Sequence, residues 1–457
     1  MSKPRLAIVG AGLSGSVLAA VLGDAFDVSV VEQSARARPL YHDIICDAGG
    51  VTSTINRAAG LGGTTNYWHN ALIELSGDEL AANRRDPVRF AQWYDRAWSL
   101  FLTASERDES RAIEAENRGA AQGAAGLAHM VVPHRRVNAW NHCRQVYSPP
   151  PATMIYGRAE RFVDDKGETR LSVHTPRGSE LVAAEHFVVA GGGLSTPALL
   201  ASSFRGGDAH CGGYHDHPMA YVAKLRLRND SWLKPVSCHD RPFASIRSGF
   251  TYRSRGLQAA FYLRPALSLD LRSIRGEARY ILSDLRNDPF SPRKILTLLT
   301  NIEALREAVL FKTHAGFRGD HYSVLMLGEQ RSTADRGLRV RPREKPLLDW
   351  RVAPDEHEAY HECFQQFVAD IAPETVAVNA VPATEWEYRT AAHHSGTARD
   401  FLAAAAPDDL ALFQVDGHPS ISVCDASVLT CGGTANSGLT LVALAHQLAA
   451  ALRDRYQ

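Results

Sequence analysis

Residues 6–15 read Leu-Ala-Ile-Val-Gly-Ala-Gly-Leu-Ser-Gly, and a second apolar stretch, Val-Ser-Val-Val-Glu, ends at Glu32. The first stretch is typical of a buried strand that leads through a glycine-rich turn into a helix. At G-x-G-x-x-G spacing, Gly10 permits a tight turn, Gly12 lets a pyrophosphate approach the backbone, and Gly15 lets helix and strand pack closely. The helix N-terminus would bind the phosphates, and Glu32 would accept hydrogen bonds from a ribose. The pattern predicts a dinucleotide-binding unit.

The composition is that of a soluble, enzyme-sized protein. The chain has 457 residues, 45% of them hydrophobic and 22% charged, which is enough for two or three domains. Its 50 Lys and Arg residues balance 50 Asp and Glu residues, so bulk charge does not indicate binding to nucleic acid or to a membrane surface. No apolar run reaches the roughly 18 residues needed to span a bilayer.

Cysteine usage and the N-terminal residues favour a cytoplasmic location. The seven Cys residues include no C-x-x-C pair, which fits reduced thiols better than a disulfide framework. The chain enters an apolar strand almost at once, without the pattern of a signal peptide.

The middle of the chain reads as alternating helical and strand-like segments. Residues 78–118 have the pattern of charged amphipathic helices, and residues 155–189 that of a strand meander. The meander ends in His-Phe-Val-Val-Ala-Gly-Gly-Gly at 186–193, another apolar strand before a glycine turn. This segment predicts a return to the sheet beside the first strand.

Residues 221–386 have the character of an inserted substrate domain, with Arg and aromatic residues interleaved in strand-like segments. Helices are expected near 292–311 and after Pro354. Between Lys224 and Lys294 there are fifteen Lys or Arg and six Asp or Glu residues, a net charge of +9. Solvated sheet faces explain this charge best, and an anionic substrate or an acidic carrier is the alternative.

Candidate chemistry lies near the C-terminus. His393-His394-Ser395-Gly396-Thr397 precedes the last predicted strand, and Thr434-Ala435-Asn436-Ser437-Gly438-Leu439-Thr440 follows it, at the start of a final helix near 439–453. A neutral imidazole, with a reference pKa of about 6.5, can take a hydroxyl proton near neutral pH. An amide beside it can orient the substrate oxygen, and an alcohol oxidation needs such a pair.

Six motifs in this order resemble the glucose–methanol–choline (GMC) family of flavin oxidoreductases. They are the stretch 10–15 with Glu32, Gly62-Gly63-Thr64-Thr65-Asn66, residues 188–200, Gly213-Tyr214-His215-Asp216-His217-Pro218, His393-x-x-Gly396-Thr397, and residues 423–427 with Asn436.

The resemblance implies FAD as cofactor and the oxidation of an alcohol to a carbonyl by hydride transfer to flavin N5. His393 would be the catalytic base and Asn436 its partner, with His394 as the competing base. Asp425 would contact the ribityl or pyrophosphate part of FAD. Some members attach FAD through a His where this chain has Tyr67, so non-covalent FAD is expected, although His69 lies nearby. The implied cofactor-binding residues are Gly10, Gly12, Leu13, Ser14, Gly15, Glu32, Gly63, Thr64, Asn66, Tyr67, Ala190, Gly191, Asp425, Ala426, Asn436 and Thr440.

The expected fold is α/β, α+β overall, with a Rossmann-like FAD-binding domain and a substrate domain of antiparallel sheet plus helices. The FAD-binding domain would comprise residues 1–77, 152–220 and 390–457, and the substrate or cap domain residues 78–151 and 221–389. The substrate would be a small alcohol such as a sugar, polyol, amino-alcohol or biosynthetic intermediate. Oxygen or another acceptor would reoxidise the flavin, as an oxidase or a dehydrogenase respectively.

Other functions fit parts of the sequence. His357-Glu358-Ala359-Tyr360-His361 matches the zinc-protease pattern H-E-x-x-H, but no third ligand is evident nearby, and no metal is expected. A redox-neutral enzyme or lyase could use the same fold, because fold does not determine function. An NAD(P)H-dependent flavin monooxygenase would normally need a second nucleotide site, and no second convincing G-x-G-x-x-G is present.

Overall fold

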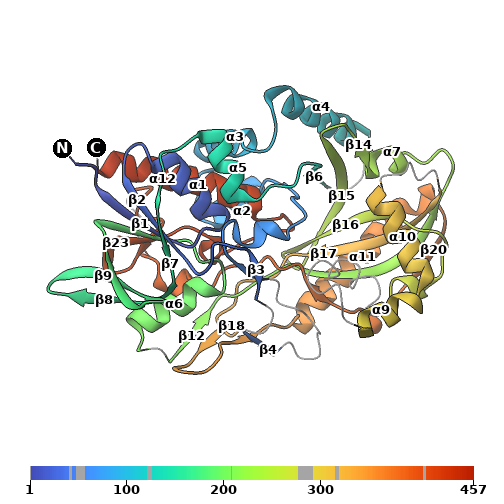
Figure 1. Ribbon diagram of the computed structural model, residues 1–457. Coiled ribbons are helices and arrows are strands. Elements are labelled where there is room, and N and C mark those ends of the chain that lie inside the picture. Colours follow the sequence, from blue (N-terminus) through green and yellow to red (C-terminus); the bar gives the residue numbers. More distant parts are fainter. Residues whose placement is uncertain are drawn as a thin grey trace.

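The computed structural model describes most of the chain as two large sheets with their covering helices. The described residues are 2–40, 44–47, 57–120, 126–206, 208–275, 292–313, 319–404 and 408–456. Figure 1 shows the sheet around β1 at one end of the molecule and the sheet around β16 and β17 at the other.

The first sheet is built around the stretch that carries the glycine motif. β1 (Arg5–Val9) pairs in parallel with β2 (Asp27–Glu32) on one side and with β11 (His186–Val189) on the other. The full order is β22-β23-β11-β1-β2-β7, where the outer strands are β7 (Thr153–Tyr156), β23 (His418–Val423) and β22 (Gln414–Val415). Strands buried on both faces explain the continuous apolar run of residues 6–9. The predicted return of 186–189 to this sheet is confirmed.

Helices cover one face of this sheet. They are α1 (Leu13–Leu22), α2 (Gly77–Ala82), α3 (Pro87–Ser99), α5 (Ala139–Tyr147) and α12 (Gly438–Tyr456). α12 packs against α1 and α3, and α5 packs against α1. Apolar side chains of β1 and these helices form one core.

The predicted meander covers the opposite face. β8 (Arg158–Asp165), β9 (Glu168–Thr175) and β10 (Gly178–Ala183) form a three-stranded antiparallel sheet, and α6 (Ser195–Phe204) packs against β8. Phe162 and Phe187 meet edge to face in the core between them.

The second large sheet is antiparallel, as the sequence predicts. Its order is β14-β15-β16-β17-β13-β20, with β6 paired to β15 and β21 paired to β13. The long strands are β6 (Gly126–Pro133), β13 (Pro218–Leu227), β15 (Ala244–Ser254), β16 (Leu257–Pro265) and β17 (His321–Gly328). The short ones are β14 (His239–Asp240), β20 (Thr375–Ala380) and β21 (Arg389–Thr390).

Helix α11 (Pro354–Ile371) closes one face of this sheet, where Phe367 stacks on Phe261 at a centroid distance of 4.8 Å. α4 (Ala104–Ala120) contacts β6 on another side, and α7 (Leu233–Ser237) packs against β15. The helix predicted at 292–311 is two helices, α9 (Pro292–Leu299) and α10 (Ile302–Thr313), because Thr300 and Asn301 interrupt it.

A small sheet between the large ones was not predicted. Its order is β12-β18-β19-β4, formed by β12 (Ala209–Gly212), β18 (Gly337–Val340), β19 (Leu347–Asp349) and β4 (Ile45–Asp47). β3 (Arg38–Pro39) pairs with β5 (Ala58–Ala59). Single turns of 3₁₀ helix are η1 (Gly63–Asn66), η2 (Leu271–Ser273), η3 (Ala372–Glu374), η4 (Ala383–Glu385), η5 (Arg399–Phe401) and η6 (Ala426–Val428). Among the described residues, no helix is long and apolar enough to cross a membrane.

A buried ion pair joins α11 to the segment before β18, and it provides a test of the fold. Arg336 and Glu356 are 2% and 1% exposed and form two hydrogen bonds of 2.7 and 2.8 Å. Glu356→Gln leaves the buried guanidinium without its counter-charge, which we expect to cost about 3–5 kcal/mol of unfolding free energy. Urea unfolding measures this cost.

The exposed pair between Arg351 and Asp335 is the control. Asp335→Asn should change the free energy of unfolding by less than about 1 kcal/mol, because exposed pairs contribute little. Equal effects of the two substitutions would contradict the assignment of Glu356 as a core charge.

Candidate functional site

The glycine turn after β1 has the geometry that its spacing predicts. Gly10 has a φ of 107°, and an added Cβ would lie 2.5 Å from the Ala190 carbonyl oxygen. An added Cβ at Gly15 would overlap the Gly10 carbonyl oxygen, so this glycine is required for helix α1 to approach the strand. At Gly12 an added Cβ would meet nothing within 4 Å. Space is therefore open beside the backbone at the start of α1.

The Glu32 carboxylate makes more hydrogen bonds to the protein itself than the sequence predicts. Its side chain is 8% exposed and accepts hydrogen bonds from the backbone N–H groups of Ala11 (2.9 Å), Gln33 (2.7 Å) and Gly60 (2.9 Å). A carboxylate has about four acceptor positions, so one position remains for a ribose hydroxyl. Glu32 thus holds the glycine turn and the segment at Gly60 together.

The turn at η1 lies against the glycine turn. The Gly62 N–H donates to the Ala11 carbonyl oxygen at 2.8 Å, and an added Cβ at Gly63 would lie 3.0 Å from the Gly12 Cα. Thr64 and Asn66 are exposed and Tyr67 is half-buried. Burial raises the pKa of Tyr67. An added Cβ at Gly438 would lie 2.7 Å from the Trp68 ring, so the N-terminus of α12 also reaches this turn.

Asp425 joins two turns at the ends of neighbouring strands. Its Oδ2 accepts from the Gly192 N–H at 2.8 Å and from the Thr196 hydroxyl at 2.5 Å. Its Oδ1 accepts from the N–H and hydroxyl of Ser427. Burial raises the pKa of Asp425, and these hydrogen bonds oppose that shift. Asp425 therefore holds the turn after β11 against η6. Ala190 and Gly191 lie in the turn after β11 and are buried and exposed respectively, and Ala426 in η6 is buried.

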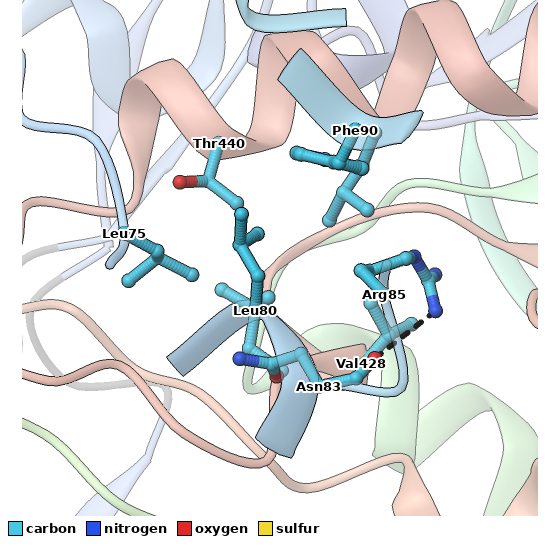
Figure 2. A pocket seen from close by; sticks show the side chains of 9 residues that line it. Leu75, Leu80, Asn83, Arg85, Phe90, Val428 and Thr440 are labelled. Carbon is cyan, nitrogen blue, oxygen red and sulfur yellow. Dashed lines mark hydrogen bonds between the residues drawn. The ribbon is translucent and has the colours of Figure 1, made fainter. Parts of the chain in front are cut away.

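Thr440 faces away from this region. Its hydroxyl is hydrogen-bonded to the Tyr94 hydroxyl at 2.9 Å. It lines a void of about 10 Å³ between α2, α3 and α12, which is at the lower limit for one water. Figure 2 shows Leu75, Leu80 and Thr440 around this space. Thr440 lies in the first turn of α12, and its contact with a cofactor stays a prediction.

Asn83 holds the loop that leads to Asn436. Its Oδ1 accepts from the N–H groups of Thr430 (2.7 Å) and Cys431 (3.3 Å), and its Nδ2 donates to the carbonyl oxygens of Cys431 and Glu79. Asn83 is 8% exposed, and Figure 2 places it beside Arg85. The sequence analysis did not identify this residue, because its partners lie almost 350 positions away.

A cluster of four histidines surrounds Asp216. The Asp216 side chain is fully buried and accepts from the backbone N–H groups of His217 (2.7 Å) and His393 (3.0 Å) and from the hydroxyl of Thr390. His215, which directly precedes Asp216, also belongs to the cluster and is 1% exposed. His394 Nδ1 lies 3.9 Å from Asp216 Oδ2. The signature at 213–218 therefore meets the motif at 393–397 in space.

Burial keeps these imidazoles neutral. It lowers the pKa of His394 and His215 to about 4 and that of His217 to about 3, and it also lowers the pKa of His393. Burial works to raise the pKa of Asp216, but the neighbouring histidines and the Thr390 hydrogen bond bring it below its ordinary value. At neutral pH the cluster thus contains one carboxylate and four uncharged rings.

The hydrogen bond between His217 and His393 couples the tautomers of the two rings. The two Nδ1 atoms are 2.9 Å apart, so one must donate and the other accept. In the arrangement where His393 donates from Nδ1, its Nε2 atom carries the lone pair that a base needs.

His394 differs from His393 in its surroundings. His394 Nδ1 is hydrogen-bonded to the Tyr214 hydroxyl at 2.9 Å, and its Nε2 is buried without a hydrogen-bond partner among the described residues. His393 is half-buried, whereas His394 is 8% exposed. An added Cβ at Gly193 would overlap the His394 carbonyl oxygen, so the motif lies directly against the turn after β11.

Asn436 lies in the loop before α12 and is half-buried. In the described part of the chain no hydrogen bond joins it to His393. The two are connected through the loop, because an added Cβ at Gly432 would lie 3.0 Å from His217 Nε2.

The other candidate features have structural partners. His357 Nδ1 is hydrogen-bonded to the Tyr388 hydroxyl at 2.7 Å, and Glu358 pairs with Arg255. No group of three or more His, Cys, Asp or Glu side chains that could hold a metal ion occurs among the residues described. Much of the basic charge of 224–294 is paired, which favours the interpretation as sheet faces. Acidic partners are assigned to Lys224, Arg226, Arg241, Arg253, Arg255, Arg272 and Arg275.

Two solved structures share this architecture over the whole chain. Pyridoxine 4-oxidase from Mesorbium loti is 14% identical with a TM-score of 0.61, and the match covers 100% of both chains. Formate oxidase is 13% identical with a TM-score of 0.59, and the match covers 100% of this chain and 99% of that one. No protein-family model and no curated protein matches the sequence. Both solved structures are GMC-family FAD oxidoreductases, so the resemblance predicted from the motifs is confirmed at the level of the fold.

Proposed function

We propose that the protein is an FAD-dependent oxidoreductase that oxidises the CH–OH group of a small alcohol to a carbonyl. The observation that carries this proposal is the arrangement around Asp216, which accepts from the His393 N–H while the neutral His393 ring lies 2.9 Å from His217. The shared fold with two GMC-family oxidases supports the flavin. The proposal that the substrate is an alcohol rests on the motifs that contain His393 and Asn436.

The residues at the glycine turn fit the dinucleotide part of FAD. Gly12 is the N-cap of α1 and makes no side-chain cap, and the first turn of the helix contains no acid. The N–H groups and positive dipole end of α1 therefore suit a diphosphate. The open space beside Gly12 gives the phosphates room to approach. Glu32 would use its remaining acceptor position for a ribose. Asp425, Ala190 and Gly191 border the same edge of the sheet and would face the ribityl part.

The flavin would supply the acceptor for a hydride. His393 Nε2 takes the hydroxyl proton, and His217 holds His393 in the required tautomer. Asp216 orients the segment through the His393 N–H and stabilises the imidazolium once it forms. Asn436 positions the substrate oxygen from the loop before α12. Tyr67 at the position of a tethering His favours non-covalent FAD.

We propose the same two-domain division of the chain that the sequence predicts. The FAD-binding part would comprise residues 1–77, 152–220 and 390–457. The core that α3 and α5 share with α1 and α12 favours adding these two helices to it. The substrate would lie between this part and the antiparallel sheet, where ligand sites concentrate.

His393→Ala should retain FAD and lose most of its flavin reduction. Removal of a general base typically lowers a rate by 10²–10⁴-fold. Anaerobic stopped-flow bleaching of the flavin by an alcohol measures the reduction rate, and the absorbance of bound FAD reports retention.

His394→Ala is the matched control, because it removes the neighbouring imidazole of the same motif. It should lower flavin reduction less than His393→Ala does. If His394→Ala causes the larger loss, the base is His394. Asn436→Ala should reduce the same rate constant by less than His393→Ala, since an amide orients but does not take the proton.

The pH dependence follows from burial of His393. Because burial lowers its pKa below the reference of about 6.5, the base stays unprotonated into mildly acidic solution. Flavin reduction should remain constant from pH 8 to about pH 6.5 and decline only below it. A decline that begins well above pH 6.5 would contradict this assignment, and the residual rate of His393→Ala should lack the decline.

Substitutions at Gly12 and Gly15 should separate effects on FAD affinity from effects on the stability of the fold. Gly12→Ala adds a methyl group where the fold has open space, so the apoprotein should lose no more than about 1 kcal/mol of stability. FAD affinity should fall at least tenfold, as measured by titration of the apoprotein. Gly15→Ala should instead destabilise the fold itself, because its Cβ overlaps the Gly10 carbonyl oxygen. Unchanged FAD affinity in Gly12→Ala would place the phosphates elsewhere.

A further inference from the structure

Ala392, which directly precedes His393, has an uncommon backbone conformation. Its φ is 60°, in the left-handed region that residues other than glycine seldom adopt. Such a conformation persists only where the surrounding structure holds it. Because Ala392 is the last residue before His393, its conformation sets the direction in which the chain enters the proposed base.

The Thr390 hydroxyl holds Ala392 in this conformation. Its Oγ1 accepts a hydrogen bond from the Ala392 N–H at 2.8 Å. A Thr side chain forms such a turn with the backbone two residues further along the chain. Thr390 is itself fixed by the pairing of β21 with β13, in which it lies opposite Pro218. The turn that leads to His393 therefore starts from a strand of the antiparallel sheet.

The same hydroxyl also donates to the buried carboxylate of Asp216. The Thr390 O–H is hydrogen-bonded to Oδ2 of this carboxylate. The other oxygen, Oδ1, accepts from the backbone N–H groups of His217 and His393. A hydroxyl can donate one hydrogen bond while it accepts another. Thr390 thus connects the carboxylate of the histidine cluster to the residue that precedes the base.

Side chains, rather than the main chain, bind the two N–H groups closest to the His393 ring. The Ala392 N–H donates to Thr390, and the His393 N–H donates to Asp216 at 3.0 Å. These two acceptors are hydrogen-bonded to each other. Loss of the Thr390 hydroxyl would therefore release Ala392 and remove a donor from Asp216 at the same time.

We propose that Thr390 is a positioning residue for the proposed base, because its hydroxyl sets the direction of the His393 ring toward the substrate. It does so by holding Ala392 in the left-handed conformation and Asp216 beside the His393 N–H. In this role Thr390 contacts neither substrate nor flavin. This inference rests on the proposed function, from which it takes His393 as the base, but the turn itself can be tested without a substrate.

Flavin reduction distinguishes positioning of the base from substrate binding. Thr390→Val keeps the branched shape of the side chain and removes the hydroxyl. It should lower the limiting rate of anaerobic flavin reduction by an alcohol about 10- to 100-fold, as expected for a misplaced catalytic group. The Kd of the alcohol should stay within about twofold, because only the reacting geometry changes. Thr390→Ser restores the hydroxyl and should return the rate to within about threefold of the wild type.

The surroundings of the His393 ring are measured by NMR on the FAD-loaded protein without substrate. Histidines labelled with ¹³C at Cε1 report the environment of each ring, and His393→Ala identifies the signal of His393. Thr390→Val should shift or broaden this signal, and Thr390→Ser should leave it at its wild-type position. If Thr390→Val does not retain FAD, Thr390→Ala takes its place with the same expected results, because it places no methyl group against Asp216.

Thr375→Val is the matched control. Thr375 begins β20, which pairs with β13 as β21 does, and its hydroxyl donates to the Ala372 carbonyl oxygen at 3.1 Å. This substitution removes a hydroxyl of the same sheet that has no bond to the histidine cluster among the described residues. It should leave the His393 signal unchanged and the reduction rate within about twofold.

The outcomes separate the two proposals. A His393 signal that moves in Thr390→Val and returns in Thr390→Ser, without flavin reduction by any alcohol, supports the positioning role and overturns the alcohol oxidation. Flavin reduction that His393→Ala abolishes but Thr390→Val leaves unchanged overturns the role of Thr390 and keeps the oxidation. A lower rate that Thr390→Ser does not recover, or that comes with equally weakened alcohol binding, also overturns the positioning role.

Discussion

The buried carboxylate of Asp216 is the interaction on which the candidate active site depends. Its two oxygens accept hydrogen bonds from the backbone of His217, the backbone of His393 and the hydroxyl of Thr390. Segments that lie about 175 residues apart in the chain therefore meet at one charge. The Asp216 N–H donates to Gln330 Oε1, and Gln330 Nε2 donates to Glu356, the core partner of Arg336. A continuous network thus links the histidine cluster to helix α11. A buried charge is tolerated only when it is paired and hydrogen-bonded, which explains why so many groups converge on this carboxylate.

Close backbone approach is the second constraint on the site. An added Cβ at Gly193 would overlap the His394 carbonyl oxygen, and one at Gly396 would overlap the Gly213 carbonyl oxygen. These glycines let the turn after β11, the segment at 213–218 and the histidine motif lie in direct backbone contact. The position of His393 is thereby determined by main-chain packing as well as by side chains. Loops positioned in this way can carry catalytic groups with the precision that the chemistry requires.

Local patterns predicted the parts of the fold whose causes are local. The strand, glycine turn and helix of residues 5–22 are determined by hydrophobic run, φ and packing within a few residues, and the structure has them as expected. Other features depend on distant partners. Glu32 stands at the predicted strand end, but only the folded chain shows that Ala11 and Gly60 already use its oxygens. Asn83 and the small sheet around β18 could not be inferred for the same reason. The histidine motif was evident, whereas its dependence on Asp216 and His217 was not, although His-Asp-His at 215–217 was a signal for it.

The charge of the histidine cluster affects which part of a substrate can lie beside His393. The histidine cluster holds one negative charge at Asp216 and no positive charge at neutral pH, because burial keeps its four rings unprotonated. An anionic group would therefore be repelled from His393. A neutral hydroxyl meets no such repulsion, so the charge of the cluster favours an uncharged group of the substrate beside His393.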